Sequence, residues 1–139
     1  QKGELVIPGD YQVLTKENRI ATRGLGEANK DDNILDIGPI AAKTFQKIIR
    51  KADFVFWNGP MGKIEDKRFQ KGTKEIIEAI INNTKAQTVI GGGDTIKSLK
   101  MLNSNFQISN SVFLSTGGGA TMAYLANKEL PGLINLDQL

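Results

Sequence analysis

The order of apolar and polar positions divides most of the chain into alternating strands and helices. Continuous apolar runs of strand length occur at Asp53–Trp57, Gln87–Ile90 and Ser111–Leu114. Before, between and after these runs, apolar residues recur at three- and four-residue intervals, which predicts helices at Pro39–Lys51, Phe69–Asn83, Thr95–Leu102 and Ala120–Lys128. The alternation predicts an α/β fold, a doubly wound, Rossmann-like parallel sheet. Strands that are apolar throughout indicate a sheet covered on both faces.

The first third of the chain has a weaker pattern. Glu4–Ile7 is apolar enough to predict a buried strand, and Tyr11–Leu14 predicts a second short strand. Thr15–Asp32 is polar, with charges of both signs, and is interpreted as a surface loop. Leu35–Pro39 interrupts the pattern, and Pro39 suits the first position of a helix because its missing N–H would have no helical partner there.

Composition narrows the chemistry that this chain could perform. Of 139 residues, 40% are hydrophobic and 24% are charged, which is typical of a globular domain. No apolar run approaches the roughly 18 residues that span a bilayer, so an integral membrane protein is excluded. Cysteine and histidine are both absent, which excludes disulfides, thiolate nucleophiles and Ser-His-Asp catalysis. The remaining chemical groups are backbone amides, carboxylates, lysines and a hard metal ion.

Charge and the first residue add two expectations. The formal charge is 18 − 15 = +3, which is too small and too dispersed to indicate nucleic-acid binding. The chain begins at Gln1 rather than Met, and we expect it to be the later part of a longer protein.

Glycine-rich turns follow three consecutive predicted strands. They are Asn58–Gly62, Gly91–Asp94 and Thr116–Gly119. Parallel strands end at one edge of their sheet, where ligands bind, and glycine lets the main chain approach a ligand closely. Two of the turns lead into helices, whose N-terminal N–H groups favour anions. A phosphate-bearing ligand is the functional interpretation, and simple tight turns are the alternative. Neither a P-loop nor a G-x-G-x-x-G motif after a strand is present.

Asp94 and Glu65 each allow two interpretations. Asp94 stands at a helix start, where an acid can cap the helix. Beside a phosphate it would instead be repelled, unless a magnesium ion lay between the two groups. Glu65 could accept hydrogen bonds from ribose hydroxyls or could be a solvated loop acid. Four further candidates are interpreted as structural. Lys97 and Lys100 are expected on a solvated helix face, and Trp57 and Phe56 in the core.

The motifs together resemble phosphoglycerate kinase in order and spacing. The matching segments are Leu35–Pro39, Trp57–Gly62 with Glu65, Phe69–Lys74, Gly91–Thr95, Ser115–Ala120 and Lys128–Gly132. The resemblance runs from about Glu4 to the end of the chain. It implies that residues 1–139 are the later part of the C-terminal, nucleotide-binding domain of a two-domain kinase. The N-terminal substrate domain and the first part of the nucleotide domain are absent from this chain.

That family transfers a phosphoryl group between ATP and 3-phosphoglycerate with Mg²⁺. The resemblance implies a cytoplasmic protein, monomeric when complete, that binds ADP or ATP here and 3-phosphoglycerate through the missing domain, with no nucleic-acid or membrane partner. The implied nucleotide-binding residues are Leu35, Asn58, Gly59, Pro60, Lys63, Glu65, Gly92, Gly93, Asp94 and Thr95. Asp94 would bind the magnesium, and Glu65 the ribose. The backbone amides implied near the transferred phosphoryl group belong to Gly93, Gly117, Gly118 and Gly119.

Some positions depart from the family pattern. Ile34 stands where the family usually has a glycine near the adenine, and Lys63 replaces a usually apolar residue at the same wall. Ala123 and Ala126 stand where acids are common. These departures keep open an alternative, a catalytically inactive nucleotide-binding module of the same fold. In either case, we expect the 139-residue chain alone to have no kinase activity.

Overall fold

The computed structural model describes residues 3–102, 111–126, 128 and 130. It divides into two compact units: residues 1–53 with 60–86, and residues 54–59 with 87–139. We refer to these as unit 1 and unit 2. No helix among the described residues is long and apolar enough to cross a membrane.

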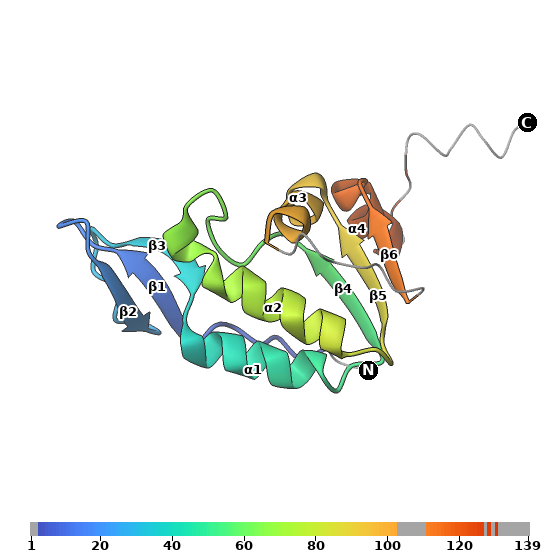
Figure 1. The fold of residues 1–139 in the computed structure, drawn as a ribbon, viewed down its shortest axis with the longest axis horizontal. Coiled ribbons are helices and arrows are strands. Elements are labelled where there is room, and N and C mark those ends of the chain that lie inside the picture. The colour runs from blue at the N-terminus through green and yellow to red at the C-terminus, as the bar shows by residue number, and fades with distance from the viewer. Residues whose placement is uncertain (1–2, 103–110, 127, 129, 131–139) are drawn as a thin grey trace, which may run out of the picture. The chain divides into compact units, whose positions relative to one another are not determined.

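Unit 1 contains an antiparallel sheet and two helices (Figure 1). The sheet has the order β2-β1-β3, with β1 at Asp10–Leu14, β2 at Ile20–Gly24 and β3 at Asn33–Ile37. Helix α1 (Pro39–Ile49) packs against α2 (Lys71–Asn82), with α1 also against β1 and α2 against β3. A short 3-10 helix, η1 (Lys67–Phe69), precedes α2. The buried apolar residues of this unit are Val13, Ile37, Ala41, Ala42, Ile64, Phe69, Ile76, Ile77, Ala79, Ile80 and Ala86.

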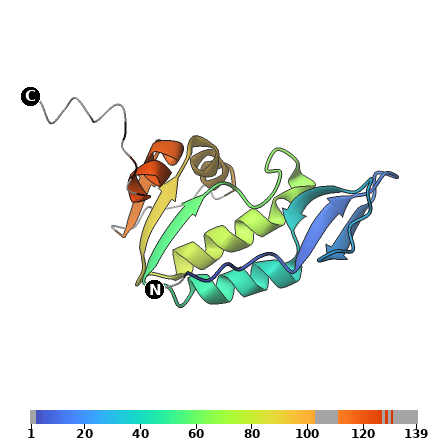
Figure 2. The ribbon, with the colours of Figure 1, turned by 180° about the vertical axis from the view of Figure 1, so that it is seen from behind.

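Unit 2 contains the parallel sheet that the apolar runs predict. Its order is β4-β5-β6, with β4 at Phe54–Asn58, β5 at Gln87–Gly91 and β6 at Val112–Ser115, side by side in Figures 1 and 2. Helix α3 (Gly93–Leu102) packs on β5 and buries Ile96 and Leu99, and α4 (Gly118–Leu125) follows β6. The predicted α/β fold with a parallel sheet is therefore confirmed.

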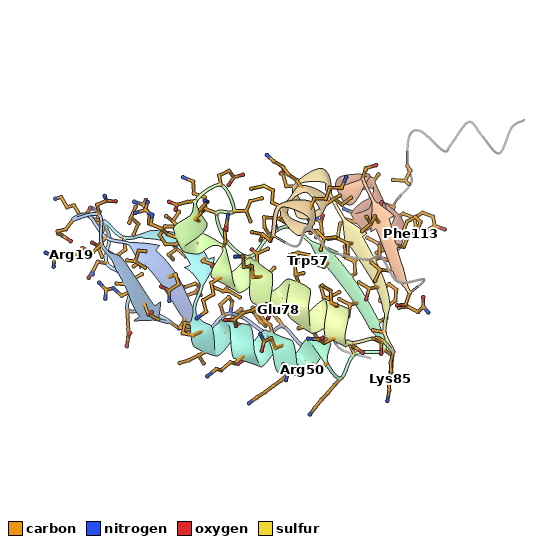
Figure 3. The ribbon with its side chains drawn as sticks, viewed as in Figure 1. Arg19, Arg50, Trp57, Glu78, Lys85 and Phe113 are labelled. Carbon is orange, nitrogen blue, oxygen red and sulfur yellow. The ribbon has the colours of Figure 1, made fainter. Side chains whose placement is uncertain are left out.

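Covering of the parallel sheet is less complete than its apolar strands indicate. Phe56, Val89 and Phe113 share one face because they are directly paired across the three strands. Phe113 is 66% exposed on that face and is labelled in Figure 3, and Phe54 is also exposed. Trp57, which has the opposite orientation along β4, is buried as predicted.

Three predictions for the first third of the chain need correction. Glu4–Ile7 forms no strand, and its apolar side chains are exposed, Leu5 at 88%. A strand needs a neighbour for its N–H and C=O groups, and this segment pairs with no strand in the part of the chain that the structure describes. Conversely, Thr15–Asp32 is not all loop, because Ile20–Gly24 pairs with β1. Leu35–Pro39, interpreted as an interruption, is also partly strand, because its first three residues belong to β3 (Asn33–Ile37).

A hairpin turn explains the unexpected strand β2. The N–H of Thr15 donates to the Arg19 carbonyl at 2.9 Å, and the N–H of Asn18 donates to the Thr15 carbonyl at 2.9 Å. Asn18 has a φ of 59°, a left-handed conformation that asparagine tolerates better than most residues. The strand is held by this turn and by backbone pairing, with few buried apolar side chains.

Candidate functional site

The glycine-rich turns of unit 2 lie at one edge of its sheet. In the parallel register, Asn58 pairs with Gly91 and Gly91 pairs with Ser115, so all three strands end at the same level. The segments that follow them, Gly59, Gly92–Thr95 and Thr116–Gly119, therefore start together. The sequence prediction that these turns share one sheet edge is confirmed.

Gly92 is the N-cap residue of α3. Its carbonyl accepts the first helical hydrogen bond, from the Ile96 N–H at 3.1 Å, and its own N–H donates to the Ser115 carbonyl at 2.9 Å. Its φ is 90°, and a Cβ built there would lie 2.6 Å from Asn58 Oδ1. Both the conformation and the space therefore require glycine. Because Gly92 occupies the cap, the interpretation of Asp94 as the N-cap is wrong.

Asp94 lies in the first turn of α3 instead. Its side chain is exposed, and within the residues that the structure describes its carboxylate has no hydrogen-bond or ion-pair partner. An acid in the first turn complements the positive end of the helix dipole, at about 0.3–1 kcal/mol. The carboxylate thus remains free to bind a cation.

The N-terminus of α4 contacts that of α3. A Cβ built on Gly118 would lie 2.8 Å from the Gly92 Cα and 3.0 Å from Asn58 Oδ1. Gly117 is the N-cap of α4, and its carbonyl accepts from the Thr121 N–H at 2.8 Å. The first N–H groups of a helix have no partner inside it. Two sets of such donors, including those of Gly93 and Gly119, therefore lie at one edge, an arrangement that favours an anion.

Thr95 has a structural role in the same unit. Its side chain is buried, and its Oγ1 accepts a hydrogen bond from the Gly59 N–H at 2.7 Å. This bond joins the turn after β4 to the first turn of α3. A contribution of Thr95 to an anion site would come from its main-chain N–H, which belongs to that first turn.

Unit 1 contains an open groove that collects three of the implied nucleotide residues. The groove has a volume of about 390 Å³ and is lined by Pro8, Tyr11, Ile34–Ile37 and Pro60–Lys63. Leu35 and Lys63 both line it, and the Lys63 N–H donates to the Leu35 carbonyl at 2.8 Å, which ties the Pro60–Lys63 segment to β3. Ile34 is half-exposed at the groove. Glu65 is exposed and does not line it.

Two buried carboxylates in unit 1 were not identified from the sequence. Asp10, on β1, accepts from the N–H groups of Ile40 and Ala41 at 3.1 and 2.7 Å and so closes the N-terminus of α1. Asp36, on β3, accepts from the Gly72 N–H at 2.8 Å and closes that of α2. Burial raises the pKa of Asp36, although hydrogen bonds from Gly72 and Ile37 oppose the shift. No local signal marks these acids, since each caps a helix more than 25 residues away in sequence.

The remaining sequence candidates are placed as follows. Lys97 and Lys100 are exposed on α3, as predicted, and border a shallow groove with Gly93 and Thr116. Phe56 is half-buried. Among the described residues, no group of three or more acidic side chains could enclose a metal ion by itself.

Comparison with known proteins identifies one family. A family model described as "Phosphoglycerate kinase" matches residues 1–128. The chain is 39% identical over 138 residues to the phosphoglycerate kinase of Wigglesworthia glossinidia brevipalpis, covering 97% of this chain and 34% of that protein. It is 48% identical over 144 residues to that of Paenarthrobacter aurescens (strain TC1), covering 96% of this chain and 34% of that protein.

Solved structures give the same result. The phosphoglycerate kinase of Coxiella burnetii aligns with a TM-score of 0.76 and 31% identity, covering 88% of this chain and 32% of that one. The enzyme of Pyrococcus horikoshii OT3 aligns with a TM-score of 0.74 and 33% identity, covering 94% and 32%. The chain thus spans about a third of the length of the relatives it matches.

Proposed function

Because this chain belongs to the phosphoglycerate kinase family, we propose that it forms the later part of the nucleotide-binding half of such a kinase. The reaction is 1,3-bisphosphoglycerate + ADP = 3-phosphoglycerate + ATP, and this part binds the nucleotide as its magnesium complex. One observation supports the proposal most: two helix N-termini meet at the edge of a parallel sheet beside an unpaired carboxylate. Phosphoryl transfer requires mainly positioning and charge stabilisation, which such an edge can supply.

In this proposal the phosphates lie against the first turns of α3 and α4. The main-chain N–H groups of Gly93 and Thr95 bind the nucleotide phosphates, and those of Gly93 and Gly117–Gly119 are directed at the transferred group. Gly92 contributes by letting the main chain approach closely, since its own N–H donates to the Ser115 carbonyl. A Cβ built on Gly93 or Gly119 would meet nothing within 4 Å, so these glycines leave open space at their amides. Asn58 and Gly59 complete this edge at the end of β4.

Asp94 fits a magnesium site of the kind that also uses phosphate oxygens. Mg²⁺ in nucleotide sites takes one or two carboxylates together with the phosphates, so a single free acid is an adequate protein contribution. The Asp94 carboxylate, which is exposed and has no partner in the described part of the chain, meets that requirement. When bound, the ion would neutralise charge on the phosphates.

The groove in unit 1 is proposed to hold the base. Leu35, Pro60 and Lys63 line it, and Glu65, two residues after Lys63, is assigned to the ribose hydroxyls. Apolar side chains at Ile34 and Leu35 suit a flat aromatic ring. Ile34 also occupies space in the groove and so limits how tightly a base could fit.

Binding of 3-phosphoglycerate is assigned to the two thirds of the relatives' length that this chain does not span. The chain alone is therefore expected to bind nucleotide without turnover. We further propose that the whole protein is a cytoplasmic, monomeric enzyme of glycolysis that acts on small molecules, not on nucleic acid or membranes. The second candidate is an inactive nucleotide-binding module, which the position of Ile34 in the groove favours. Turnover by the complete protein separates the two.

The substitution Asp94→Asn tests the proposed phosphate and metal site. Asn keeps the size of the side chain. Because Asp94 makes no capping hydrogen bond, the substitution should lower the free energy of unfolding only by the helix-dipole contribution of about 0.3–1 kcal/mol. We expect Mg-ADP affinity to fall about tenfold or more, equivalent to about 1.4 kcal/mol, with metal-free ADP affinity changing less. Glu78→Gln, at an exposed acid on α2 (Figure 3), is the control. Equal Mg-ADP affinity in Asp94→Asn and the wild type would refute the metal assignment.

A further inference from the structure

One wall of the groove in unit 1 is a loop without regular structure. It runs from Pro60 to Asp66, before η1 begins at Lys67. Met61, Gly62 and Lys63 of this loop line the groove. A loop that forms a binding wall has a defined shape only where specific bonds fix its main chain.

Thr73 provides two of those bonds from a single atom. It is the third residue of α2 and is completely buried, at 0% exposure. Its Oγ1 accepts hydrogen bonds from the N–H of Met61 at 3.0 Å and from the N–H of Gly62 at 3.3 Å. A hydroxyl oxygen has two acceptor positions, so both successive donors can be satisfied at once.

The other bonds to this loop act at different residues. The Lys63 N–H reaches the Leu35 carbonyl, and Gln70 Nε2 donates to the Ile64 carbonyl at 2.7 Å. Among the described residues, no other group accepts from the N–H groups of Met61 and Gly62. Thr73 therefore fixes the part of the wall that lies ahead of Lys63.

Gly62 shows how closely the loop approaches the body of unit 1. A Cβ built there would overlap the Asp36 carboxylate and the Phe69 carbonyl. The loop keeps this position only if its main chain stays against β3 and α2. Thr73 contributes to this by supplying the oxygen that accepts from the loop N–H groups. The same Asp36 carboxylate binds the Gly72 N–H, next to Thr73, so strand, helix and loop meet at one point.

We infer that Thr73 is a positioning residue that sets the base-binding wall of the nucleotide groove, an inference that rests on the proposed function of this groove. Thr73 is not among the residues that line the groove. It acts through the main chain of Met61 and Gly62. Its loss should weaken recognition of the base, whereas phosphate binding depends on the amides of unit 2 and should persist.

Three variants separate the hydroxyl from the methyl group. Thr73→Val keeps the shape and removes the acceptor, Thr73→Ser keeps the acceptor, and Thr73→Ala lacks both. Thr44→Val is the matched control, because the Thr44 hydroxyl donates within α1 to the Ile40 carbonyl at 3.0 Å and lies outside the groove. Far-UV circular dichroism checks folding, and if Thr73→Val does not fold, the Ser and Ala variants form the comparison.

The first measurement is amide hydrogen exchange without ligand. Thr73→Val should accelerate exchange at Met61 and Gly62 by about tenfold or more beyond its effect on the core amide of Val13, since local opening is governed by the bonds that close it. Thr73→Ser should restore slow exchange. Unchanged exchange at Met61 and Gly62 in Thr73→Val would overturn the inference.

The second measurement is calorimetric titration with Mg-ADP and with Mg-pyrophosphate. We expect Thr73→Val to lose about tenfold in Mg-ADP affinity, equivalent to about 1.4 kcal/mol, with pyrophosphate affinity unchanged and Thr73→Ser close to the wild type. Equal loss for both ligands, or for neither, would contradict a role in base recognition. If the wild-type chain bound neither ligand, the proposed function would fail, while the exchange data would still decide whether Thr73 holds the loop.

Discussion

Replacing Asp10 with alanine removes the carboxylate that closes the N-terminus of α1. Asp10 is 2% exposed, and its two oxygens accept from the N–H groups of Ile40 and Ala41 at 3.1 and 2.7 Å. A hydrogen bond to a charged group contributes about 1.5–3 kcal/mol, and loss of a helix cap costs about 0.5–2 kcal/mol. Water can reach the exposed Ile40 side of the helix, so we expect Asp10→Ala to lower the free energy of unfolding by about 2–4 kcal/mol. Such a loss is large against a typical total of about 5–15 kcal/mol.

Urea unfolding followed by far-UV circular dichroism measures this loss. Asp31→Ala is the control, because Asp31 is exposed and its carboxylate has no partner among the described residues. Asp10→Asn keeps one acceptor oxygen and should lose an intermediate amount. Amide exchange at Ile40 and Ala41 should accelerate in the alanine variant. If Asp10→Ala were as stable as Asp31→Ala within about 0.5 kcal/mol, the capping role would be refuted.

Three further predictions follow from single residues. Gly92→Ala places a Cβ at a residue with a φ of 90° and close to Asn58 Oδ1. The free energy of unfolding, measured by thermal denaturation, should fall by about 1–3 kcal/mol, and Mg-ADP binding should weaken; wild-type stability and affinity would contradict this. Burial raises the pKa of Asp36 above 3.8, so the stability that this group contributes is greatest below pH 3.8 and is lost as the pH rises through the folded-state pKa. The difference in unfolding free energy between the wild type and Asp36→Asn should therefore shrink or reverse over that pH range. A pH-independent difference would contradict the raised pKa. Ile34→Gly should increase Mg-ADP affinity in calorimetry while weakening β3 by about 0.5–1 kcal/mol, and unchanged affinity would show that Ile34 does not limit the groove.

The sequence predicted those elements that bury continuous apolar surface. Phe54–Asn58 and Gln87–Gly91 appear within a residue of their predicted bounds, because each is a continuous apolar run of strand length. The pattern overstated their burial, since Phe54 remains exposed. The antiparallel sheet was partly missed for the opposite reason. Ile20–Gly24 is half-exposed and depends on backbone pairing and on the turn at Asn18, neither of which produces a hydrophobic pattern. Glu4–Ile7 has the pattern without a pairing neighbour in the described structure.

The candidate site was predictable where chain order alone decides position. The glycine turns had to share one edge because parallel strands end together, and the register confirms it. Identifying the cap of α3 needed the backbone conformation of Gly92, which no residue type reveals. Asp10 and Thr73 were invisible in the sequence because their partners lie 11 to 31 residues away. The roles assigned to Glu65 and Asp94 remain predictions that the titrations above address.

The central claim is the proposal that the first turns of α3 and α4 in unit 2 bind the phosphates of Mg-ADP. Titration of the ¹⁵N-labelled 139-residue chain with Mg-ADP, followed by amide chemical shifts, tests it most directly. We expect saturable shifts concentrated at Gly92–Thr95 and Gly117–Gly119, and much weaker saturation in Asp94→Asn. An unsaturable response, or shifts confined to residues away from these segments, would contradict it.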